Sequence, residues 1–369
     1  MLAGDLLRAV GAAVVGDQHL TAHTTALKVP LRLVDADRKS LRLIEAGHQN
    51  GELGLRSWNH RWRGLPVARV ASSIVQNRGI VKLGLVVTTL GRLDRLRELL
   101  ESLRGQLTAD DRLVIVAQQQ LDAVELLAAG FRAPDFRIQV TTSAPGASRG
   151  RNAGVEALGA DAGRLLHFPN DTTWFPTGAV ERMRLLPDDF TTGALTIIDE
   201  HGPKFVLPEP GTPLDRWNAW TVIEMGLLIR QDLFQSLGGF NPDLGTGAAT
   251  PWQAGEVTDL LLRLIRDGHS DGFAWQPATL HLGGIADAHG LSTTERRRKL
   301  RGYGRGLGRL VATWRYPLWW RIAFTGGGLF FGLRHPATNT PLDGWWVMLG
   351  RLEGTLGRTF GDAGRAVTR

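Results

Sequence analysis

From Val81 onward, short apolar runs alternate with amphipathic stretches along the chain. The runs VKLGLVVTTL, RLVIVAQ, FRIQVTT and RLLHFP predict four buried strands, which begin near Val81, Arg112, Phe136 and Arg164. Between the first two runs, residues 92–103 place their leucines on one face of a predicted helix. Strands that recur roughly every 24 to 30 residues with helices between them are typical of βαβ units. We therefore predict a parallel sheet in this part of the chain.

The two ends of the chain lack this alternation. Residues 28–47 (KVPLRLVDADRKSLRLIEAG) predict two strands joined around residues 35–38, so we expect a small β-rich accessory unit at the amino terminus. Downstream of the α/β pattern, the chain becomes basic and rich in tryptophan. We predict three parts: the accessory unit over 1–80, an α/β domain over 81–291 and a helical tail over 292–369.

The overall composition is ordinary for a globular protein, with 43% hydrophobic and 21% charged residues. The absence of cysteine excludes a disulfide framework and a thiolate metal site. Near the amino terminus, Asp5 and Arg8 interrupt the apolar run, and we therefore expect no secretory signal.

The tail differs from the rest of the chain in charge and in aromatic content. Residues 292–369 carry 14 Lys and Arg against four Asp and Glu, a net charge of +10, while the first 291 residues have a net charge of −3. Five of the twelve tryptophans lie in the tail. This asymmetry predicts an anionic partner, a membrane surface or a nucleic acid, for one end of the protein. Because the tail lacks interleaved stacking motifs, we expect no nucleic acid.

One segment of the tail, residues 317–333 (PLWWRIAFTGGGLFFGL), is largely apolar. Arg321 and the glycines at 326–328 interrupt it, and it is shorter than the about 20 residues that a spanning helix needs. We predict that it lies in the membrane interface, with its arginines reaching the headgroups. A helix docked on the α/β domain is the alternative, because Trp and Phe also fill ordinary cores.

Small and polar residues follow the first two predicted strands: Thr88, Thr89, Gly91, Arg92 and Gln118. Ligands of parallel sheets bind beyond such strand ends, and small residues there let the backbone approach a nucleotide. The segment SRGRNAGVEAL then begins a predicted helix that carries Arg151 and Asn152. The free N–H groups of a helix start favour phosphate or sugar oxygens, whereas a capped helix with surface arginines is the alternative.

A second polar element, FPNDTTWF, follows the fourth predicted strand and contains Asn170 and Asp171. A carboxylate at such a strand end suits a hard divalent cation, which neutralises a pyrophosphate, or it suits a ribose. Further along, WQPATLHLGG places His281 close to a strand end. The same residue is a candidate metal ligand or a structural histidine.

The segment GEVTDLLLRL predicts an amphipathic helix with Glu256 and Asp259 in its first turn. Three residues apart, the two carboxylates share one face of the helix. Such a carboxylate is suited to take a proton from an attacking hydroxyl group. For Asp259, a helix-cap role or an ion pair with Arg263 is the alternative.

In order and spacing, these motifs over roughly residues 82–315 resemble the family 2 GT-A glycosyltransferases, in particular the bacterial branch that builds polysaccharide and cell wall. Residues 151–154 (Arg-Asn-Ala-Gly) resemble the Arg-Asn-x-Gly segment of the nucleotide pocket. FPNDTTWF resembles the acidic DXD cluster but retains only its middle carboxylate, Asp171. GEVTDLLLR resembles the GEGTDLLLR form, which keeps the glutamate, and the tail's Tyr-Gly-Arg-Gly is similar to that branch.

The resemblance implies a GT-A (Rossmann-like) α/β fold, a mixed, mainly parallel sheet flanked by helices, with a membrane-proximal helical tail. It implies an inverting hexosyl- or deoxyhexosyltransferase that uses a UDP, dTDP or GDP sugar and a glycan or lipid-linked saccharide acceptor. Such an enzyme is expected in the cytoplasm, peripheral on the inner face of the cell membrane. The resemblance implies Mn²⁺ or Mg²⁺ as a cofactor. Asn170 and Thr172 stand where the family has carboxylates, and they weaken this metal site.

The resemblance also assigns roles to individual residues. Glu256 is the expected base, and Asp259 is the second candidate. The expected contacts with the nucleotide sugar are Thr88, Thr89, Gly91, Arg92, Gln118, Arg151, Asn152, Asn170 and Asp171. The expected acceptor contacts are Glu224, Trp252 and Trp174, and the expected metal ligands are Asp171 and His281.

Two other functions stay open at this point. A degenerate glycosyltransferase that binds nucleotide or glycan without turnover is suggested by the departures at Gln118, Thr172 and Val257. A Rossmann oxidoreductase is disfavoured, because the first strand ends in TTLGRLDRL rather than in a G-x-G-x-x-G fingerprint.

Overall fold

The computed structural model of the protein describes four stretches of the chain, residues 81–187, 189–285, 290–334 and 339–361. All of them belong to one compact unit. The β-rich unit predicted over residues 1–80 lies outside the described residues. The predicted boundary at residue 291 stays a prediction, and the helix that follows it begins at Thr293.

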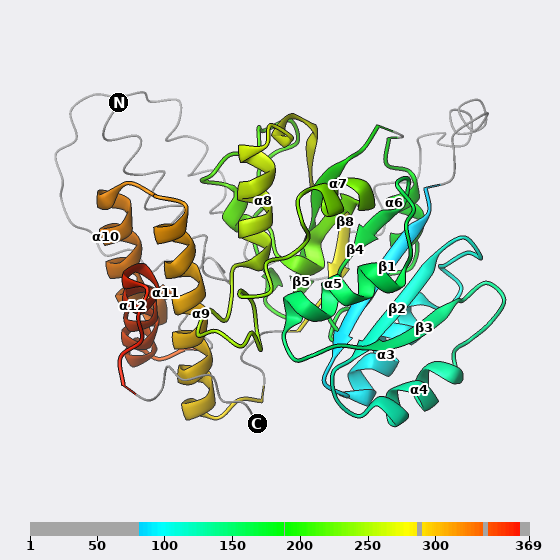
Figure 1. Ribbon diagram of the computed structural model, residues 1–369, viewed down its shortest axis with the longest axis horizontal. Coiled ribbons are helices and arrows are strands. Elements are labelled where there is room, and N and C mark those ends of the chain that lie inside the picture. Colours follow the sequence, from blue (N-terminus) through cyan, green and yellow to red (C-terminus); the bar gives the residue numbers. More distant parts are fainter. Residues whose placement is uncertain (1–80, 188, 286–289, 335–338, 362–369) are drawn as a thin grey trace, which may run out of the picture. The chain divides into compact units, whose positions relative to one another are not determined.

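Within the described residues, eight strands form one mixed sheet (Figure 1) in the order β3-β2-β1-β4-β7-β5-β6, with β8 paired to β5. In chain order the strands are β1 (Leu83–Thr89), β2 (Arg112–Ala117), β3 (Ile138–Thr142), β4 (Leu165–His167), β5 (Thr192–Asp199), β6 (Gly202–Pro203), β7 (Leu227–Arg230) and β8 (Phe273–Gly283). Strands β1 to β4 pair in parallel, as do β5 and β8. Strand β7 runs antiparallel between β4 and β5, and β6 is antiparallel to β5. The predicted mixed, mainly parallel sheet is confirmed.

Helices flank this sheet, as predicted. They are α3 (Leu93–Leu103), α4 (Leu121–Ala129), α5 (Ala147–Ala157), α6 (Ala179–Arg184), α7 (Gln231–Ser236) and α8 (Glu256–Arg266), with the 3-10 turns η3 (Ala219–Thr221), η4 (Glu224–Gly226) and η5 (Ser270–Gly272). Helix α3 lies where the leucine spacing predicted a helix, and its leucines at 96, 99, 100 and 103 are buried. The amphipathic pattern therefore identified the face that packs on the sheet.

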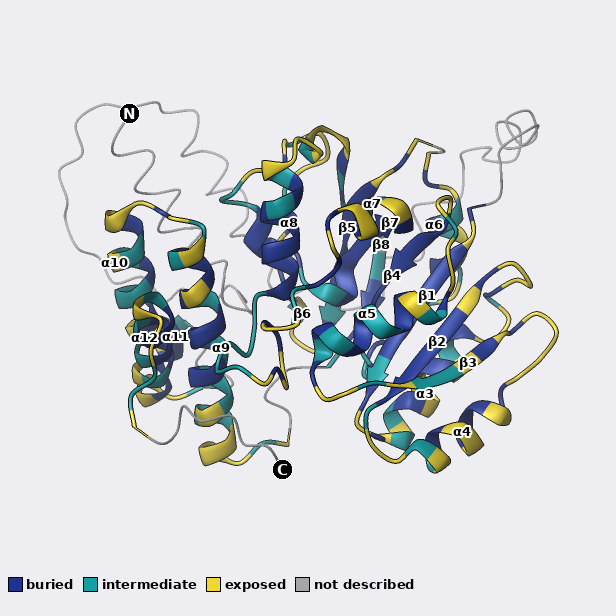
Figure 2. Ribbon diagram, in the orientation of Figure 1, coloured by how far each residue is buried: buried dark blue, intermediate teal, exposed yellow. Residues whose placement is uncertain are grey.

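The side chains of β1 alternate between the two faces of the sheet. Leu83, Leu85 and Val87 pack in a cluster with α3, α4 and α6, whereas Val86 packs in a second cluster with α5, α7 and α8. Both faces are therefore covered by helices, and the buried residues (dark blue in Figure 2) follow the strands and the helix faces that meet them. The polar residues that follow β1 and β4 lie beyond the carboxyl ends of these strands.

Helix α5 approaches β1 closely because it carries glycines. A Cβ on Gly154 would clash with the Val86 side chain, and a Cβ on Gly150 would lie 2.6 Å from Cγ2 of Thr88. Larger side chains here would push the helix off the sheet. The glycines of RGRNAG thus hold Arg151, which lies between them, near the ends of the strands.

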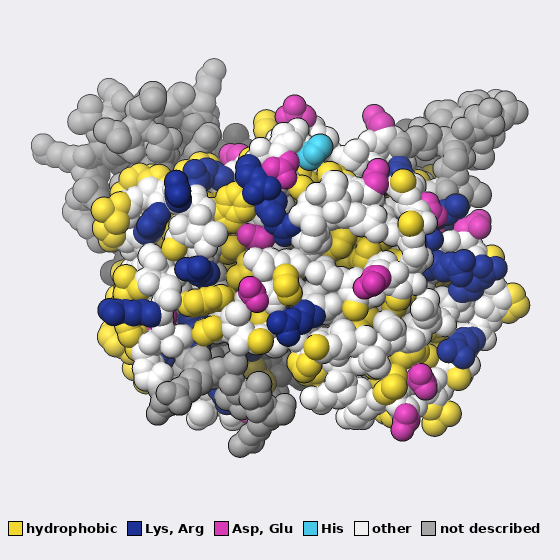
Figure 3. All heavy atoms as spheres, viewed as in Figure 1, with side chains coloured by type: hydrophobic (Ala, Val, Ile, Leu, Met, Phe, Trp, Pro, Cys, Tyr) yellow, Lys and Arg dark blue, Asp and Glu magenta, His cyan; other side chains and the backbone are white. Residues whose placement is uncertain are grey.

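The C-terminal region is helical, as predicted, and consists of α9 (Thr293–Thr313), α10 (Leu318–Gly327), η6 (Gly328–Phe330), α11 (Phe331–Arg334) and α12 (Pro341–Leu356). A capping box formed by Ser292 and Glu295 begins α9. Helices α9 and α12 pack against each other along much of their length. On the surface of this region, hydrophobic side chains lie among Lys and Arg side chains (Figure 3).

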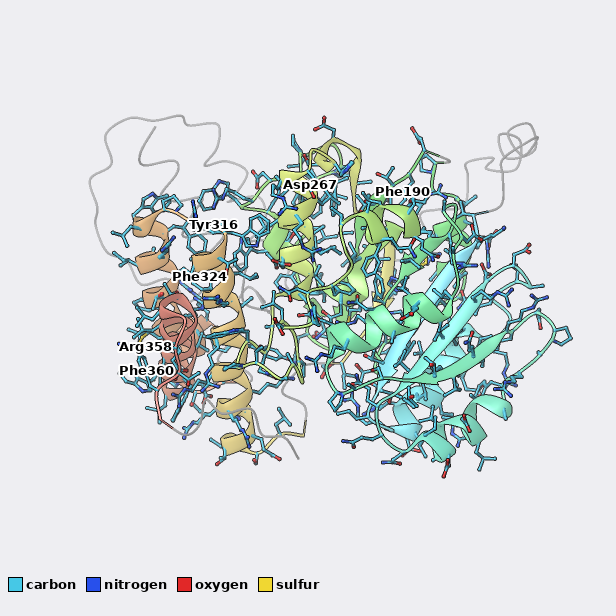
Figure 4. All side chains as sticks on the ribbon, viewed as in Figure 1. Phe190, Asp267, Tyr316, Phe324, Arg358 and Phe360 are labelled. Atoms are coloured by element: carbon cyan, nitrogen blue, oxygen red, sulfur yellow. The ribbon has the colours of Figure 1, made fainter. Side chains whose placement is uncertain are left out.

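A third hydrophobic cluster joins α10 to the rest of the unit. Tyr316 and Phe324 (labelled in Figure 4) pack with Trp320 against Trp220 and against Leu262 of α8. The inner face of α10 is therefore docked on the rest of the unit, as the alternative prediction for residues 317–333 expected. Its outer face is exposed to solvent.

Candidate active site

Asp171 lies just beyond the carboxyl end of β4 and is 1% exposed. Thr89, at the end of the neighbouring β1, donates a hydrogen bond of 2.8 Å from Oγ1 to Oδ2 of Asp171. Arg92 donates to both oxygens of the same carboxylate, over 3.1 Å from Nε to Oδ2 and from its terminal nitrogen to Oδ1. Because β1 and β4 are parallel neighbours, residues 79 and 82 positions apart in the chain meet at the carboxyl ends of these two strands.

The turn after β1 holds Arg92 in place for this contact. Gly91 adopts a left-handed backbone with φ of 85°, and its N–H donates to Oγ1 of Thr89 over 3.0 Å. The side chain of Arg92 is 59% exposed, although its guanidinium group reaches the buried Asp171. An exposed arginine on a buried carboxylate is accessible to an anionic ligand.

Arg151 on α5 is the centre of a second group of charges. Its Nη1 lies 2.9 Å from Oε1 of Glu256, and its Nη2 lies 3.5 Å from Oε1 of Glu224 and 3.2 Å from Oδ1 of Asn170. Asn170 in turn donates from Nδ2 to Oε1 of Glu224 over 2.8 Å. Since Asn170 precedes Asp171 in the chain, the two groups of charges are adjacent.

Glu256 is the first residue of α8 and is buried. Burial raises the pKa of its carboxyl group, Arg151 opposes this shift, and the neighbouring Glu224 carboxylate adds to it. Gly255 before it has φ of 97°, and a Cβ there would lie 2.5 Å from Leu310 of α9. The backbone at the start of α8 is therefore fixed by α9, and with it the position of Glu256.

Asp259 lies one turn further along α8 and faces the C-terminal helices. It accepts a hydrogen bond from Nε of Arg263 over 3.0 Å and another from Nε1 of Trp314 over 3.0 Å. The ion pair with Arg263 that the sequence offered as the alternative is present. These contacts connect α8 to the end of α9, while the catalytic role proposed for Asp259 stays a prediction.

Two of the residues expected at the nucleotide hold neighbouring loops. Gln118, after β2, donates from Nε2 to the carbonyl oxygens of Ala144 and Gly146, each over 2.9 Å. Asn152 pairs with the backbone of Phe240, donating over 2.8 Å and accepting over 2.9 Å. They fix the loop that begins α5 and the turn that follows α7.

Three predicted residues lie outside the hydrogen-bonded network that the described residues form around Arg151 and Asp171. Trp174 is partly exposed, pairs through its backbone with Gly283 and covers this glycine with its indole ring. Trp252 is half-buried in the third hydrophobic cluster. His281 is half-buried in β8, where its backbone pairs with Thr196.

Around Asp171, the side-chain oxygens accept hydrogen bonds from neighbouring side chains. In the described part of the chain, no group of three or more His, Asp or Glu side chains is arranged to hold a metal ion. Both oxygens of Asp171 already accept hydrogen bonds from Arg92 and Thr89, and the side-chain oxygen of Asn170 accepts one from Arg151. The guanidinium groups of Arg92 and Arg151 thus contact the side-chain oxygens of Asp171 and Asn170.

One further charged pair was not predicted from the sequence. Lys204, which follows β6, is buried, with Nζ 3.8 Å from Oδ2 of the buried Asp199. A Cβ on Gly284 would contact both the Lys204 side chain and Met225, the neighbour of Glu224. Local pattern did not reveal this pair, because it depends on the contact of β5 with the chain that follows it.

No family model and no curated protein matches the chain. Among solved structures, the chain is similar to S. aureus TarS 1-349 in complex with UDP-GlcNAc, with 12% identity and a TM-score of 0.46 over 75% of this chain and 93% of that chain. It is also similar to the mannosyltransferase PcManGT from Pyrobaculum calidifontis in complex with GDP-Man and Mn²⁺, with 11% identity and a TM-score of 0.49 over 74% of this chain and 87% of that chain. Similarity at this level carries no information about individual residues, so the site is assigned from its own geometry.

Proposed function

We propose that the protein is an inverting GT-A glycosyltransferase, which transfers a sugar from a nucleoside diphosphate donor to a hydroxyl group of an acceptor. One observation carries this proposal: a buried glutamate of raised pKa, Glu256, lies in one network with Arg151 and beside the Arg92–Asp171 pair. The network lies at the carboxyl edge of a mainly parallel sheet, where ligands of such sheets bind. The order of motifs in the sequence supports the same family.

Glu256 is the proposed base. Its carboxylate takes the proton of the acceptor hydroxyl as the hydroxyl oxygen forms a bond to the anomeric carbon of the sugar. The bond from this carbon to the diphosphate oxygen breaks on the opposite face, and the nucleoside diphosphate leaves with the electron pair. A pKa raised by burial makes the carboxylate a stronger base than an exposed glutamate.

The two arginines are the proposed partners of the diphosphate. Arg92 is exposed and held on Asp171, and Arg151 is held by Glu224 and Glu256. A guanidinium group binds phosphate oxygens in a bidentate manner and stabilises the charge that develops on the leaving group. That Asp171 and His281 hold Mn²⁺ or Mg²⁺ stays a prediction, which donor binding with and without EDTA tests.

The finer assignments are also proposals. The nucleotide is proposed to lie along Thr88, Thr89, Gly91 and Gln118, at the ends of β1 and β2. The acceptor, a glycan or a lipid-linked saccharide, is proposed to lie near Glu224 with Trp174 or Trp252 at a sugar face. The expected branch, which builds polysaccharide and cell wall, rests on the motifs alone.

A donor-hydrolysis assay with the purified protein tests the proposed function. Nucleotide sugars of UDP, dTDP and GDP are screened first by thermal shift, because a ligand of the native state raises the melting temperature. Glu256→Gln is expected to lower turnover about 10²- to 10⁴-fold, as for the loss of a general base. Asp259→Asn on the same helix tests the second candidate base, and it is expected to keep most of the activity when Glu256 is the base. The exposed Glu98→Gln on α3 is the control and is expected to be as active as wild type. Equal background from wild type and Glu256→Gln would contradict the proposed enzyme.

A degenerate glycosyltransferase is the second candidate, and the ion pair between Arg151 and Glu256 favours it. A base that is engaged by an arginine in the free protein is less available for a proton. Under this function, a nucleoside diphosphate raises the melting temperature of both wild type and Glu256→Gln, and neither protein turns over a donor.

A further inference from the structure

Helix α12 has its polar side chains inside and its apolar side chains outside. Its buried positions are Asp343, Gly344, Val347, Gly350, Arg351, Glu353 and Gly354. Its exposed or half-exposed positions include Leu342, Trp345, Trp346, Leu349, Leu352 and Leu356. A helix on the surface of a protein in water shows the reverse arrangement.

Glycines and ion pairs hold α12 on α9. A Cβ on Gly304 or Gly308 of α9 would clash with the backbone of α12, and one on Gly350 or Gly354 of α12 would clash with the backbone of α9. The pairs are spaced four residues apart on each helix, which lets the two backbones approach closely. Small-xxx-small spacing of this kind is typical of helix pairs in lipid, where burial of apolar surface does not drive association.

Between the two helices, Glu353 is fully buried and paired with two arginines of α9. Its Oε2 accepts hydrogen bonds from Nε of Arg301 over 3.0 Å and from Nε of Arg305 over 2.7 Å, and Arg301 also binds Oε1. At the start of α12, the buried Asp343 binds Arg296 and Arg297. Charged groups in membrane proteins are likewise turned inward and paired.

Exposed apolar side chains are concentrated in this region. Of the fourteen large hydrophobic residues that are exposed in the described chain, nine lie between Leu318 and Leu356. Beyond those of α12 they are Leu318 and Trp319 (71% and 42% exposed), Ile322, Leu329, Phe330 and Leu333. They come from α10, η6 and α11, so the apolar face extends over several helices.

Basic residues accompany this face. Arg315 precedes α10 and Arg358 follows α12, and both are exposed. Residues 292–369 as a whole carry a net charge of +10. Tryptophan and arginine together suit the boundary between acyl chains and anionic headgroups.

No described helix is long and apolar enough to cross a membrane. Helix α12 has 16 residues, which span about 24 Å, less than the about 30 Å of a hydrocarbon core. The apolar face would therefore enter one leaflet without crossing the bilayer.

We propose that the outer face of α10, η6, α11 and α12 is a lipid-binding surface, which inserts into one leaflet of a bilayer with anionic headgroups. Three features fit a lipid leaflet with anionic headgroups. They are the exposed apolar face, the glycines and ion pairs between α9 and α12, and the basic residues beside the face. A second copy of the chain would cover the apolar face but would not account for the excess of positive charge. The proposal does not depend on the proposed transferase activity.

Vesicle flotation of the full chain tests this surface. Wild type is expected to float with vesicles of phosphatidylcholine and phosphatidylglycerol, and brominated lipid is expected to quench its tryptophan fluorescence. The triple variant Ile322→Gln, Leu333→Gln and Trp345→Gln is expected to bind more than about tenfold more weakly, because three apolar side chains lose their place in lipid. The matched control replaces three exposed apolar residues of the sheet region by Gln, namely Leu126, Leu185 and Val206, and is expected to bind like wild type.

Three outcomes would overturn the proposal. The first is wild type that stays below the vesicles. The second is flotation without quenching, which would mean a purely electrostatic contact. The third is a dimer, seen by sedimentation without lipid, that the triple variant abolishes while wild type binds no vesicles, which would make the face a contact between copies. The replaced side chains are exposed, so circular dichroism is expected to show folded variants in every case.

Discussion

The sheet region and the C-terminal helices distribute polarity in opposite ways. In the sheet region, strands such as β1 are buried and apolar, and charged groups gather beyond the strand ends. In the helical region, charged side chains and glycines form much of the α9–α12 interface, and Leu and Trp face outward. The first arrangement is stabilised by removing apolar surface from water, whereas the second depends on close backbone packing and paired charges.

The two regions also hold their functional surfaces in place by different interactions. In the sheet region, the packed core fixes the strands, so the loops after them bring Arg92 to Asp171 and Arg151 to Glu256. In the helical region, the proposed lipid surface depends on the buried Glu353, because that carboxylate holds α12 on α9. Mutations are therefore expected to act by different mechanisms in the two regions.

The largest effect is expected from Glu353→Ala. The substitution leaves Arg301 and Arg305 buried without their carboxylate, which costs about 3–5 kcal/mol. Hydrogen exchange followed by mass spectrometry is expected to show the loss in α9 and α12 first. The counterpart is Leu99→Ala in the sheet core, which is expected to cost about 2–5 kcal/mol through a cavity and to affect the sheet helices instead. Uniform loss of protection over both regions in either variant would contradict the separate stabilisation of the sheet region and the C-terminal helices.

A pH effect is expected in the sheet region, at His167. Burial lowers the pKa of His167 to about 4 from its ordinary 6.5, and Nδ1 lies 3.0 Å from the carbonyl oxygen of Leu227. As the pH falls, the unfolded chain takes up a proton at this residue before the folded chain does. The neutral His167 therefore contributes fully to the free energy of unfolding above about pH 6.5. This contribution, about 3 kcal/mol in all, is lost as the pH falls towards 4. Urea unfolding at several pH values measures it, and an unchanged slope in His167→Gln would contradict the assignment.

A smaller effect is expected from Gly308→Ala on α9. The added methyl group meets the backbone of Arg351 and Thr355, so the helices must separate at a cost of about 1–3 kcal/mol. The matched control is Gly326→Ala on α10, where nothing lies within 4 Å of an added Cβ. The control is expected to leave the melting temperature unchanged or to raise it slightly. Equal effects of the two substitutions would show that close approach does not hold α9 and α12 together.

The smallest effect is expected from Glu224→Gln, as a shift of the pH profile. Removal of the Glu224 charge lowers the raised pKa of Glu256, since the neighbouring carboxylate adds to that shift. The base is then deprotonated at lower pH, and the acidic limb of kcat/KM moves to lower pH. Asp259→Asn is expected to leave this limb in place. If the acidic limb of kcat/KM does not move in Glu224→Gln, Glu256 is not the group whose titration produces that limb.

Several local elements of the protein could be predicted from the sequence. Apolar periodicity located β1 to β4 and the helix α3. A polar strand end singled out Asp171, and the starts of two predicted helices singled out Arg151 and Glu256. These features are local, because periodicity and turn chemistry act over a few neighbouring residues. The strand β5, the antiparallel direction of β7 and the pairing of β8 were not predicted, since all three depend on partners from distant segments.

Which charged side chains contact each other depends on the tertiary structure. Arg151 and Glu256 lie 105 residues apart in the chain, and Arg92 and Asp171 lie 79 apart, yet each pair is in direct contact. The same holds for the raised pKa of Glu256, which results from burial and from Glu224, and for the inward direction of Glu353 between α9 and α12. Burial and electrostatic interaction depend on distance in space, and the chain order of residues does not contain that distance until the sheet and helices have packed.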